Sequence, residues 1–102
     1  MSEPTVTVTQ YSVNAHPDPE AIDADLFEVT VDYCGNGKWA VRRGKRCYNR
    51  HADWEYEPIP SDRTKPWLKR FRFDTAEHAI DIAKRVTANL VINGTTARQA
   101  VR

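Results

Sequence analysis

A cysteine in a basic stretch is the first candidate for chemistry in this sequence. Cys47 has Lys45, Arg46, Arg50 and His51 nearby, and neighbouring cations lower the pKa of a thiol and so make it more nucleophilic. A catalytic cysteine also needs an oriented base and an oxyanion site, and no motif identifies either. An ordinary thiol in a basic loop is the simpler interpretation, and no catalytic residue is predicted.

Metal binding is a second candidate, because Cys34, Cys47 and His51 could supply three ligands and His16 or His78 a fourth. Structural zinc sites usually show paired ligands such as C-x₂₋₄-C. The two cysteines are too far apart in the sequence for that pairing. We therefore expect no metal and no cofactor, with free thiols in a reducing compartment and a Cys34–Cys47 disulfide as the alternative in an oxidising one.

Two nearby carboxylates, Glu55 and Glu57, would lie on one face of a short strand. Such a pair could carry out general acid–base catalysis. The alternative is that these acids, with Asp53, neutralise Arg50 and Arg63 in a solvated charge network. We favour the network, so the sequence predicts a protein that is not an enzyme.

Bases and aromatic residues interleave over residues 38–50 and 67–72. Single-strand nucleic-acid binders combine cations with stacking platforms, and aromatic residues with arginine are also typical of protein–protein hot spots. The predicted binding residues are Arg42, Arg43, Lys45, Arg46, Arg50, Trp54, Trp67, Arg70 and Arg72. The sequence pI of about 7.8 lies below the value of about 9 expected of a nucleic-acid domain. We therefore predict an interaction protein with a protein partner, and a nucleic-acid-binding module as the alternative.

The charges are unevenly distributed, although the net charge is only +1. Residues 1–35 contain seven acids and no Lys or Arg, and residues 36–72 contain eleven bases against four acids. Residues 1–25 are predicted to be an acidic N-terminal segment, with an edge strand over 5–10 and a loop containing Pro17 and Pro19. We expect residues 14–25 either to hang loosely or to lie against the basic segment.

Residues 26–102 are predicted to form one domain, which starts with a β-hairpin over residues 27–42. Apolar residues occupy every second position from Phe27 to Tyr33, as in a strand with one buried face. Asn36-Gly37 is the strongest short-range signal for a type I′ hairpin turn, and Trp39 and Val41 mark the returning strand.

The second half of the chain is predicted to add strands and helices. Trp54 to Glu57 and residues 67–73 alternate as strands, the latter with Phe71 and Phe73 inward and Arg70 and Arg72 outward. Asp74 is expected to cap an amphipathic helix that ends near Asn89. A strand over residues 90–92, an Asn93-Gly94 turn and a short C-terminal helix capped by Thr96 follow. This order predicts an α+β fold, a small mainly antiparallel sheet with the amphipathic helix packed across it.

The composition is that of an ordinary globular protein, with 40% hydrophobic and 28% charged residues in 102. No apolar run approaches the roughly 18–20 residues of a membrane span, and no basic start leads into an apolar stretch as in a signal peptide. We expect a cytoplasmic protein that does not contact membranes.

Several short motifs carry a resemblance to a group of proteins. They are Lys38 to Arg42, Trp54 to Pro58, Trp67-Leu68 before Phe71 to Asp74, the helix around Ala79 to Ala83, and Val91 to Gly94. Over about residues 37–101 the chain resembles small uncharacterised proteins of actinobacteria and their phages. The resemblance implies a compact α+β fold and a phage origin, and with it the host cytoplasm as the compartment and a host or phage protein as the partner. It implies no activity.

Overall fold

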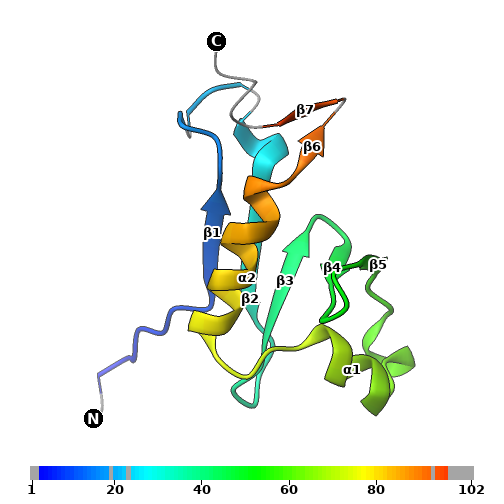
Figure 1. Ribbon diagram of the computed structural model, residues 1–102. Coiled ribbons are helices and arrows are strands. Elements are labelled where there is room, and N and C mark those ends of the chain that lie inside the picture. Colours follow the sequence, from blue (N-terminus) through cyan, green and yellow to red (C-terminus); the bar gives the residue numbers. More distant parts are fainter. Residues whose placement is uncertain (1–2, 19, 23, 93, 97–102) are drawn as a thin grey trace.

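The computed structural model describes residues 3–18, 20–22, 24–92 and 94–96. It is an α+β fold in which five antiparallel strands form one sheet and the long helix α2 lies across it (Figure 1). The elements in chain order are β1 Gln10–Asn14, η1 Ala24–Phe27, β2 Glu28–Tyr33, β3 Trp39–Arg43, β4 Arg46–Tyr48, β5 Trp54–Tyr56, η2 Pro60–Asp62, α1 Lys65–Phe71, α2 Ala76–Ala88, β6 Val91–Ile92 and β7 Thr95–Thr96. None of the described helices is long and apolar enough to cross a membrane.

The predicted hairpin is confirmed as β2 and β3, whose register pairs Val31 with Val41. Asn36 and Gly37 both have positive φ, 54° and 74°, and the amide of Lys38 donates to the carbonyl of Gly35 at 3.0 Å. These are the signs of a type I′ turn, which matches the twist of the flanking strands. The turn chemistry therefore fixes the register on which the rest of the sheet is built.

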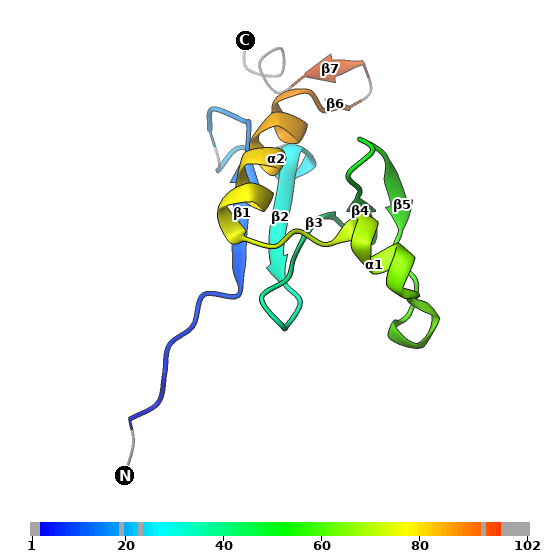
Figure 2. The same ribbon diagram turned by 60° about the horizontal axis from the view of Figure 1, so that its bottom comes forward.

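The edge strand predicted over residues 5–10 lies further along the chain, at Gln10–Asn14. β1 pairs antiparallel with β2 and its register runs from Gln10 opposite Asp32 to Asn14 opposite Glu28. Because β2 ends at Tyr33 and the chain then turns, residues 3–8 have no strand to pair with. They extend away from the sheet instead (Figure 2).

Apolar clusters occupy both faces of the sheet. Successive residues of a strand point to opposite faces, so Val41 packs under α2 and Ala40 faces away from it. The cluster under α2 contains Val29, Val31, Val41, Phe73, Ala79 and Ala83. The cluster on the other face contains Ala40, Cys47, Trp67 and Phe71, so the helix α1 covers part of the face that α2 leaves open.

The strand predicted over residues 67–73 is wrong, because residues 65–71 form the helix α1. The Thr64 side chain accepts a hydrogen bond from the amide of Trp67 at 3.2 Å, and a proline in the first turn is compatible with a helix start. Trp67 and Phe71, one helical turn apart, stack with centroids 4.3 Å apart. Only Phe73 joins the sheet, through an isolated bridge to Trp39.

Helix α2 begins one residue later than the sequence suggested. Thr75 caps it, accepting from the amide of His78 at 3.1 Å, while Asp74 forms an ion pair with Lys38. The hydrogen bond and charge of Lys38 lower the pKa of Asp74 below its ordinary value. The helix ends at Ala88, with Asn89 as its C-cap, as predicted.

Beyond α2 the chain forms a small antiparallel pair, β6 with β7. The predicted strand is confirmed at Val91–Ile92. Thr96, expected to cap a C-terminal helix, lies in β7. The rest of that predicted helix, like Asn93 of the predicted turn, falls outside the described residues.

The described part of the 14–25 segment is fixed by hydrogen bonds to the domain. The amide of Ala15 donates to Thr87 Oγ1 at 3.3 Å, Asn14 pairs with Glu28 in the sheet, and His16 is buried. Within the segment, the side chain of Asn14 donates to the Ala24 carbonyl at 2.8 Å. The described acids of this segment, Asp18, Glu20 and Asp25, are exposed, and none of the ion pairs found among the described residues joins them to the basic segment. The expectation that the segment hangs loosely is wrong for these residues.

Thr87 joins α2 to two other parts of the chain, and its hydroxyl is expected to be important for stability. The Oγ1 atom donates to the carbonyl of Phe27 and accepts from the amide of Ala15. Thr87→Val would keep the shape but leave both backbone groups without this partner, which costs about 1–3 kcal/mol. Urea denaturation measures this loss, with Thr87→Ser as the control that keeps the hydroxyl. Equal stability of Thr87→Val and the wild type would contradict this role.

Candidate functional site

The structure divides the nine predicted binding residues into two groups. Arg42, Trp67 and Arg72 point into the protein: Trp67 and Arg72 are 8% and 6% exposed, and the Arg42 side chain is 25% exposed. The prediction that Arg72 faces outward from a strand is wrong, because α1 ends at Phe71 and the following backbone turns its side chain inward. These three residues therefore stabilise the fold rather than form a surface.

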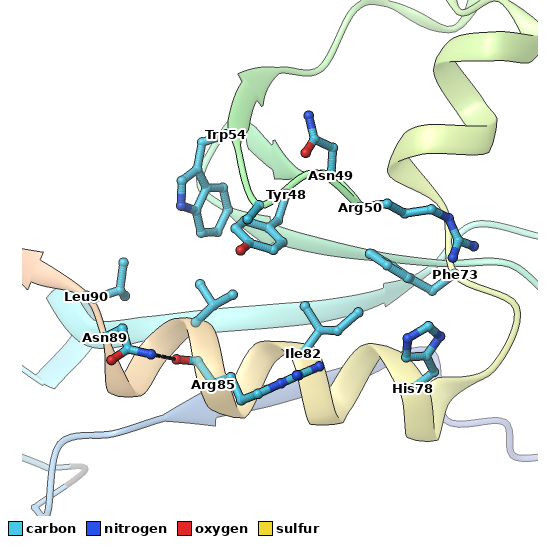
Figure 3. A pocket seen from close by; sticks show the side chains of 12 residues that line it. Tyr48, Asn49, Arg50, Trp54, Phe73, His78, Ile82, Arg85, Asn89 and Leu90 are labelled. Carbon is cyan, nitrogen blue, oxygen red and sulfur yellow. Dashed lines mark hydrogen bonds between the residues drawn. The ribbon is translucent and has the colours of Figure 1, made fainter.

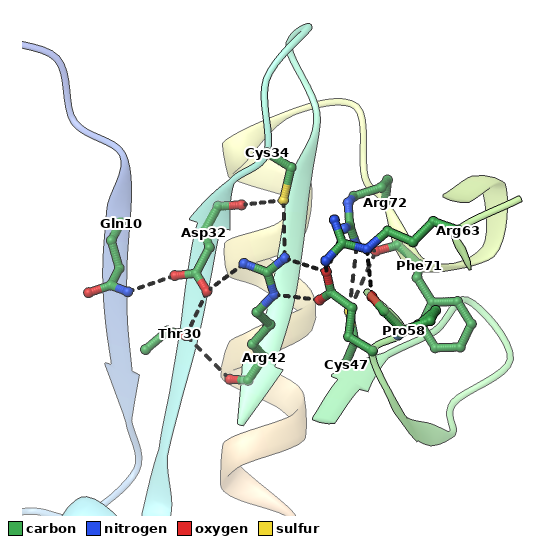
Figure 4. Close-up of polar contacts among 11 residues, drawn as sticks. Gln10, Thr30, Asp32, Cys34, Arg42, Cys47, Pro58, Arg63, Phe71 and Arg72 are labelled. Atoms are coloured by element: carbon green, nitrogen blue, oxygen red, sulfur yellow. Dashed lines mark hydrogen bonds and ion pairs between the residues drawn. The ribbon is translucent and has the colours of Figure 1, made fainter. Parts of the chain in front are cut away.

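The inward arginines belong to an arginine network formed by Asp32, Arg42, Glu57, Arg63 and Arg72 (Figure 4). Arg42 binds Glu57 through two parallel hydrogen bonds of 2.7 and 2.8 Å and also reaches Asp32 at 3.2 Å. The second Glu57 oxygen also lies 2.6 Å from Arg63 and 2.9 Å from Arg72. One carboxylate thus accepts hydrogen bonds from Arg42 and Arg72 and forms an ion pair with Arg63, and such charge-assisted bonds are among the strongest that side chains form.

The charge state of Glu57 results from two opposing influences. Burial, the largest, acts to raise its pKa, but the hydrogen bond and charge of Arg42, together with Arg72, outweigh it. The pKa of Glu57 therefore lies below its ordinary value, and the group is ionised at neutral pH.

The carboxylate pair proposed from the sequence does not act as a unit. Glu57 is held in the arginine network, whereas Glu55 is exposed and accepts from the Asn49 side chain at 3.3 Å. The expected contact with Arg63 is present. Arg50 instead donates to the backbone carbonyls of Lys69 and Arg72. Of the predicted charge network only the Glu57–Arg63 pair is present, and it is partly buried rather than solvated.

Both cysteines contact arginines and are free thiols. Cys47 is fully buried, and burial, which here outweighs the neighbouring Arg72 and Arg42, raises the pKa of its thiol to about 12. The prediction that nearby bases lower this pKa is wrong, because the fold buries the thiol in the apolar cluster with Ala40, Trp67 and Phe71, and the loss of water outweighs the arginine charges. Across residues 3–18, 20–22, 24–92 and 94–96, no three His, Cys, Asp or Glu side chains come together as a metal site would require.

A groove of about 600 Å³ lies between α2 and the β4–β5 hairpin. Figure 3 shows Tyr48 and Trp54 on the hairpin side facing Ile82 and Arg85 of the helix. The full lining is Tyr48, Asn49, Arg50, Ala52, Trp54, Phe73, His78, Ile82, Arg85, Val86, Asn89 and Leu90. These described residues include aromatic rings, two arginines and a histidine but no carboxylate.

The groove walls are held in place by contacts between rings and cations. Tyr48 and Trp54 meet edge to face with centroids 5.0 Å apart, a favourable geometry for aromatic pairs. The Arg50 guanidinium lies 5.1 Å from the Phe73 ring centroid, and its two backbone hydrogen bonds fix its position. Such walls present an apolar floor with positive charge at its border, which fits an anionic ligand that has an apolar part.

The groove unites only two of the predicted residues, Arg50 and Trp54. The others point elsewhere: Arg43 donates to the Leu26 carbonyl, Arg46 lies over the Tyr56 ring, and Lys45 and Arg70 are exposed outside the groove. The basic stripe expected from the sequence is therefore divided.

Sequence reasoning missed the helical side of the groove, namely His78, Ile82, Arg85, Val86 and Asn89. Arg85 reads as an ordinary exposed residue of an amphipathic helix. The spacing of these residues gave one usable signal, because residues 78, 82, 85 and 89 follow the three- and four-residue steps of one helix face.

No protein family, curated protein or solved structure matches this chain.

Proposed function

We propose that the protein is a non-catalytic binding module that holds an acidic segment of a partner protein in the groove between α2 and the β4–β5 hairpin. The observation that carries the proposal is the lining itself, with Trp54 and Tyr48 beside Arg50 and Arg85 and no acid among the described lining residues. Buried aromatic anchors with arginine are typical of the residues that dominate protein–protein affinity.

A protein partner fits better than a nucleic acid because several residues of the predicted basic surface point into the protein. Arg42 and Arg72 turn inward and are paired with Glu57, and Trp67 is buried. Nucleic-acid binding depends on many phosphate contacts along a continuous basic track. The cations that remain in the groove suffice for a short acidic segment. The resemblance to actinobacterial and phage proteins adds the expectation of a host or phage protein as partner, met in the cytoplasm.

The groove residues are expected to determine affinity for acidic peptides. Selection from a library of short random peptides should enrich Asp and Glu next to apolar residues, because cations surround an apolar floor. Trp54→Ala should weaken binding of a selected peptide roughly thirtyfold, and Arg85→Glu about tenfold or more, because it places an acid in the groove. Fluorescence anisotropy at low salt measures both.

Matched controls exist on the same two elements. Tyr56 shares β5 with Trp54, and Lys84 precedes Arg85 in α2, yet both are exposed and lie outside the groove lining. Tyr56→Ala and Lys84→Glu should therefore leave affinity unchanged within about twofold. Selection without acid enrichment, or oligothymidine that binds more tightly than the selected peptide, would refute the proposal.

A further inference from the structure

Residues 5–14 form an uninterrupted stretch without a charged residue, a proline or a glycine. Its second half is β1, the edge strand of the sheet. Its first half projects beyond β2, with Val6 95% and Val8 55% exposed. Threonine and valine alternate there, a composition that favours extended strands.

The hydrogen-bonding groups of this edge are directed outward at alternate residues. The amide of Tyr33 donates to the carbonyl of Thr9 at 2.8 Å, so the backbone groups of Thr9, Tyr11 and Val13 face β2. In an antiparallel ladder these groups alternate, which directs the amides and carbonyls of Gln10 and Ser12 away from β2. An incoming strand would meet a regular row of donors and acceptors.

The opposite edge of the sheet is different. β5 has only three residues, and its flanks carry Asp53 on one side and Glu57-Pro58 on the other. Short strands, charges and prolines are the usual means by which sheet edges avoid pairing with other chains. The β1 edge has Glu3-Pro4 directly before it, but residues 5–14 themselves are more than three times as long as β5 and contain no charge or proline. The two edges of one sheet therefore differ in the length of strand that they leave unprotected.

We propose that two copies of this chain pair antiparallel through residues 5–14 and so join their sheets into one. A second copy is the occupant because the same segment is complementary to itself about a two-fold axis. Its lack of charge lets two copies meet without repulsion. The outward-facing residues must lie opposite one another, for example Gln10 opposite Gln10 and Val8 opposite Ser12, so nine paired residues would give a seam about 30 Å long. Val6, Val8 and the outward backbone groups of β1 become covered.

Sedimentation equilibrium of the full chain from about 1 µM to about 1 mM tests this pairing. The mass should rise from 11.7 kDa towards twice that value. Val6→Lys with Val8→Lys places like charges on facing strands and should weaken the dimer at least about tenfold. The matched control is Ile22→Lys with Ile59→Lys, which adds the same charge at apolar residues 102% and 63% exposed and should leave the dimer intact.

Hydrogen exchange locates the interface independently of the mutations. The amides of Gln10 and Ser12 should gain protection as the protein concentration rises, whereas the amide of Tyr56, which faces outward from the β5 edge, should not. A chain that stays monomeric throughout the concentration range would overturn the proposal. So would a dimer that tolerates Val6→Lys with Val8→Lys, or one whose outward β1 amides exchange at the same rate as in the monomer.

Discussion

Glu57→Gln is expected to destabilise the protein by about 3 kcal/mol, near the lower end of the cost of removing one partner from a buried ion pair. The substitution leaves three guanidinium groups facing a neutral amide. Arg72 is the most affected, because it is buried and its position depends on this carboxylate. Arg42 and Arg63 are each about a quarter exposed, so water relieves part of their cost.

Urea denaturation at neutral pH measures this loss. Glu55→Gln is the matched control, since Glu55 lies two residues away, is exposed and takes no part in the arginine network. It should change stability by no more than about 0.5 kcal/mol. If the two variants were equally stable, the network would contribute nothing.

The stability difference between the wild type and Glu57→Gln is also expected to depend on pH. Because the pKa of Glu57 is lowered by folding, the unfolded chain binds a proton at acidic pH more readily than the folded chain does. The stabilisation is therefore complete above the ordinary glutamate pKa of about 4.3 and is lost as the pH falls below it. The stability difference between wild type and Glu57→Gln should narrow over this range, and a constant difference would contradict the assignment.

Phe71→Ala is expected to cost about 3–5 kcal/mol, the range for deleting a large buried ring. Phe71 is fully buried and stacks on Trp67 in the cluster on the sheet face opposite α2. That cluster contains few residues, so little can move in to fill the cavity. A loss of this size is a large part of the total stability of a small domain, which is about 5–15 kcal/mol.

Thermal and urea unfolding both report this loss, and Tyr56→Ala serves as the control. Tyr56 is an aromatic residue that is 68% exposed, and its truncation removes mainly its contact with Arg46. It should cost less than about 1 kcal/mol. Similar effects of the two substitutions would show that α1 does not cover a real core.

The sequence was sufficient for those parts of the fold whose patterns are local. The Asn36-Gly37 turn needs positive φ, and few residue pairs other than Asn-Gly adopt it easily, so the β2–β3 hairpin was predictable. The alanine-rich face of α2, with Ala79 and Ala83 buried, likewise follows from helical spacing.

Residues 67–73 show why the rest was not predictable. Phe71 and Phe73 alternate as in a strand, whereas Trp67 and Phe71 are also spaced by one helical turn. Both patterns bury the same rings, so periodicity could not separate them. The Thr64 cap and Pro66 in the first turn favour the helix.

The candidate site was harder to predict because it depends on contacts between distant segments. In the sequence, Glu57 is one of several acids with no sign of a special role. In the folded protein Arg42, Arg63 and Arg72 all contact it. That convergence removes bases from the surface. The groove, in turn, forms only because α2 and the β4–β5 hairpin face each other in the folded protein. The distribution of charges along the sequence does not show which segments will face each other.

The strand order of the sheet equals the order of the strands along the chain. Each pairing therefore joins neighbours in sequence, and the β2–β3 and β3–β4 hairpins can form on the microsecond timescale of isolated hairpins. Helix α2, by contrast, contacts β1 across most of the chain, and closing so long a loop has the larger entropic cost. We therefore expect the docking of α2 onto the sheet, rather than the pairing of neighbouring strands, to limit the folding rate.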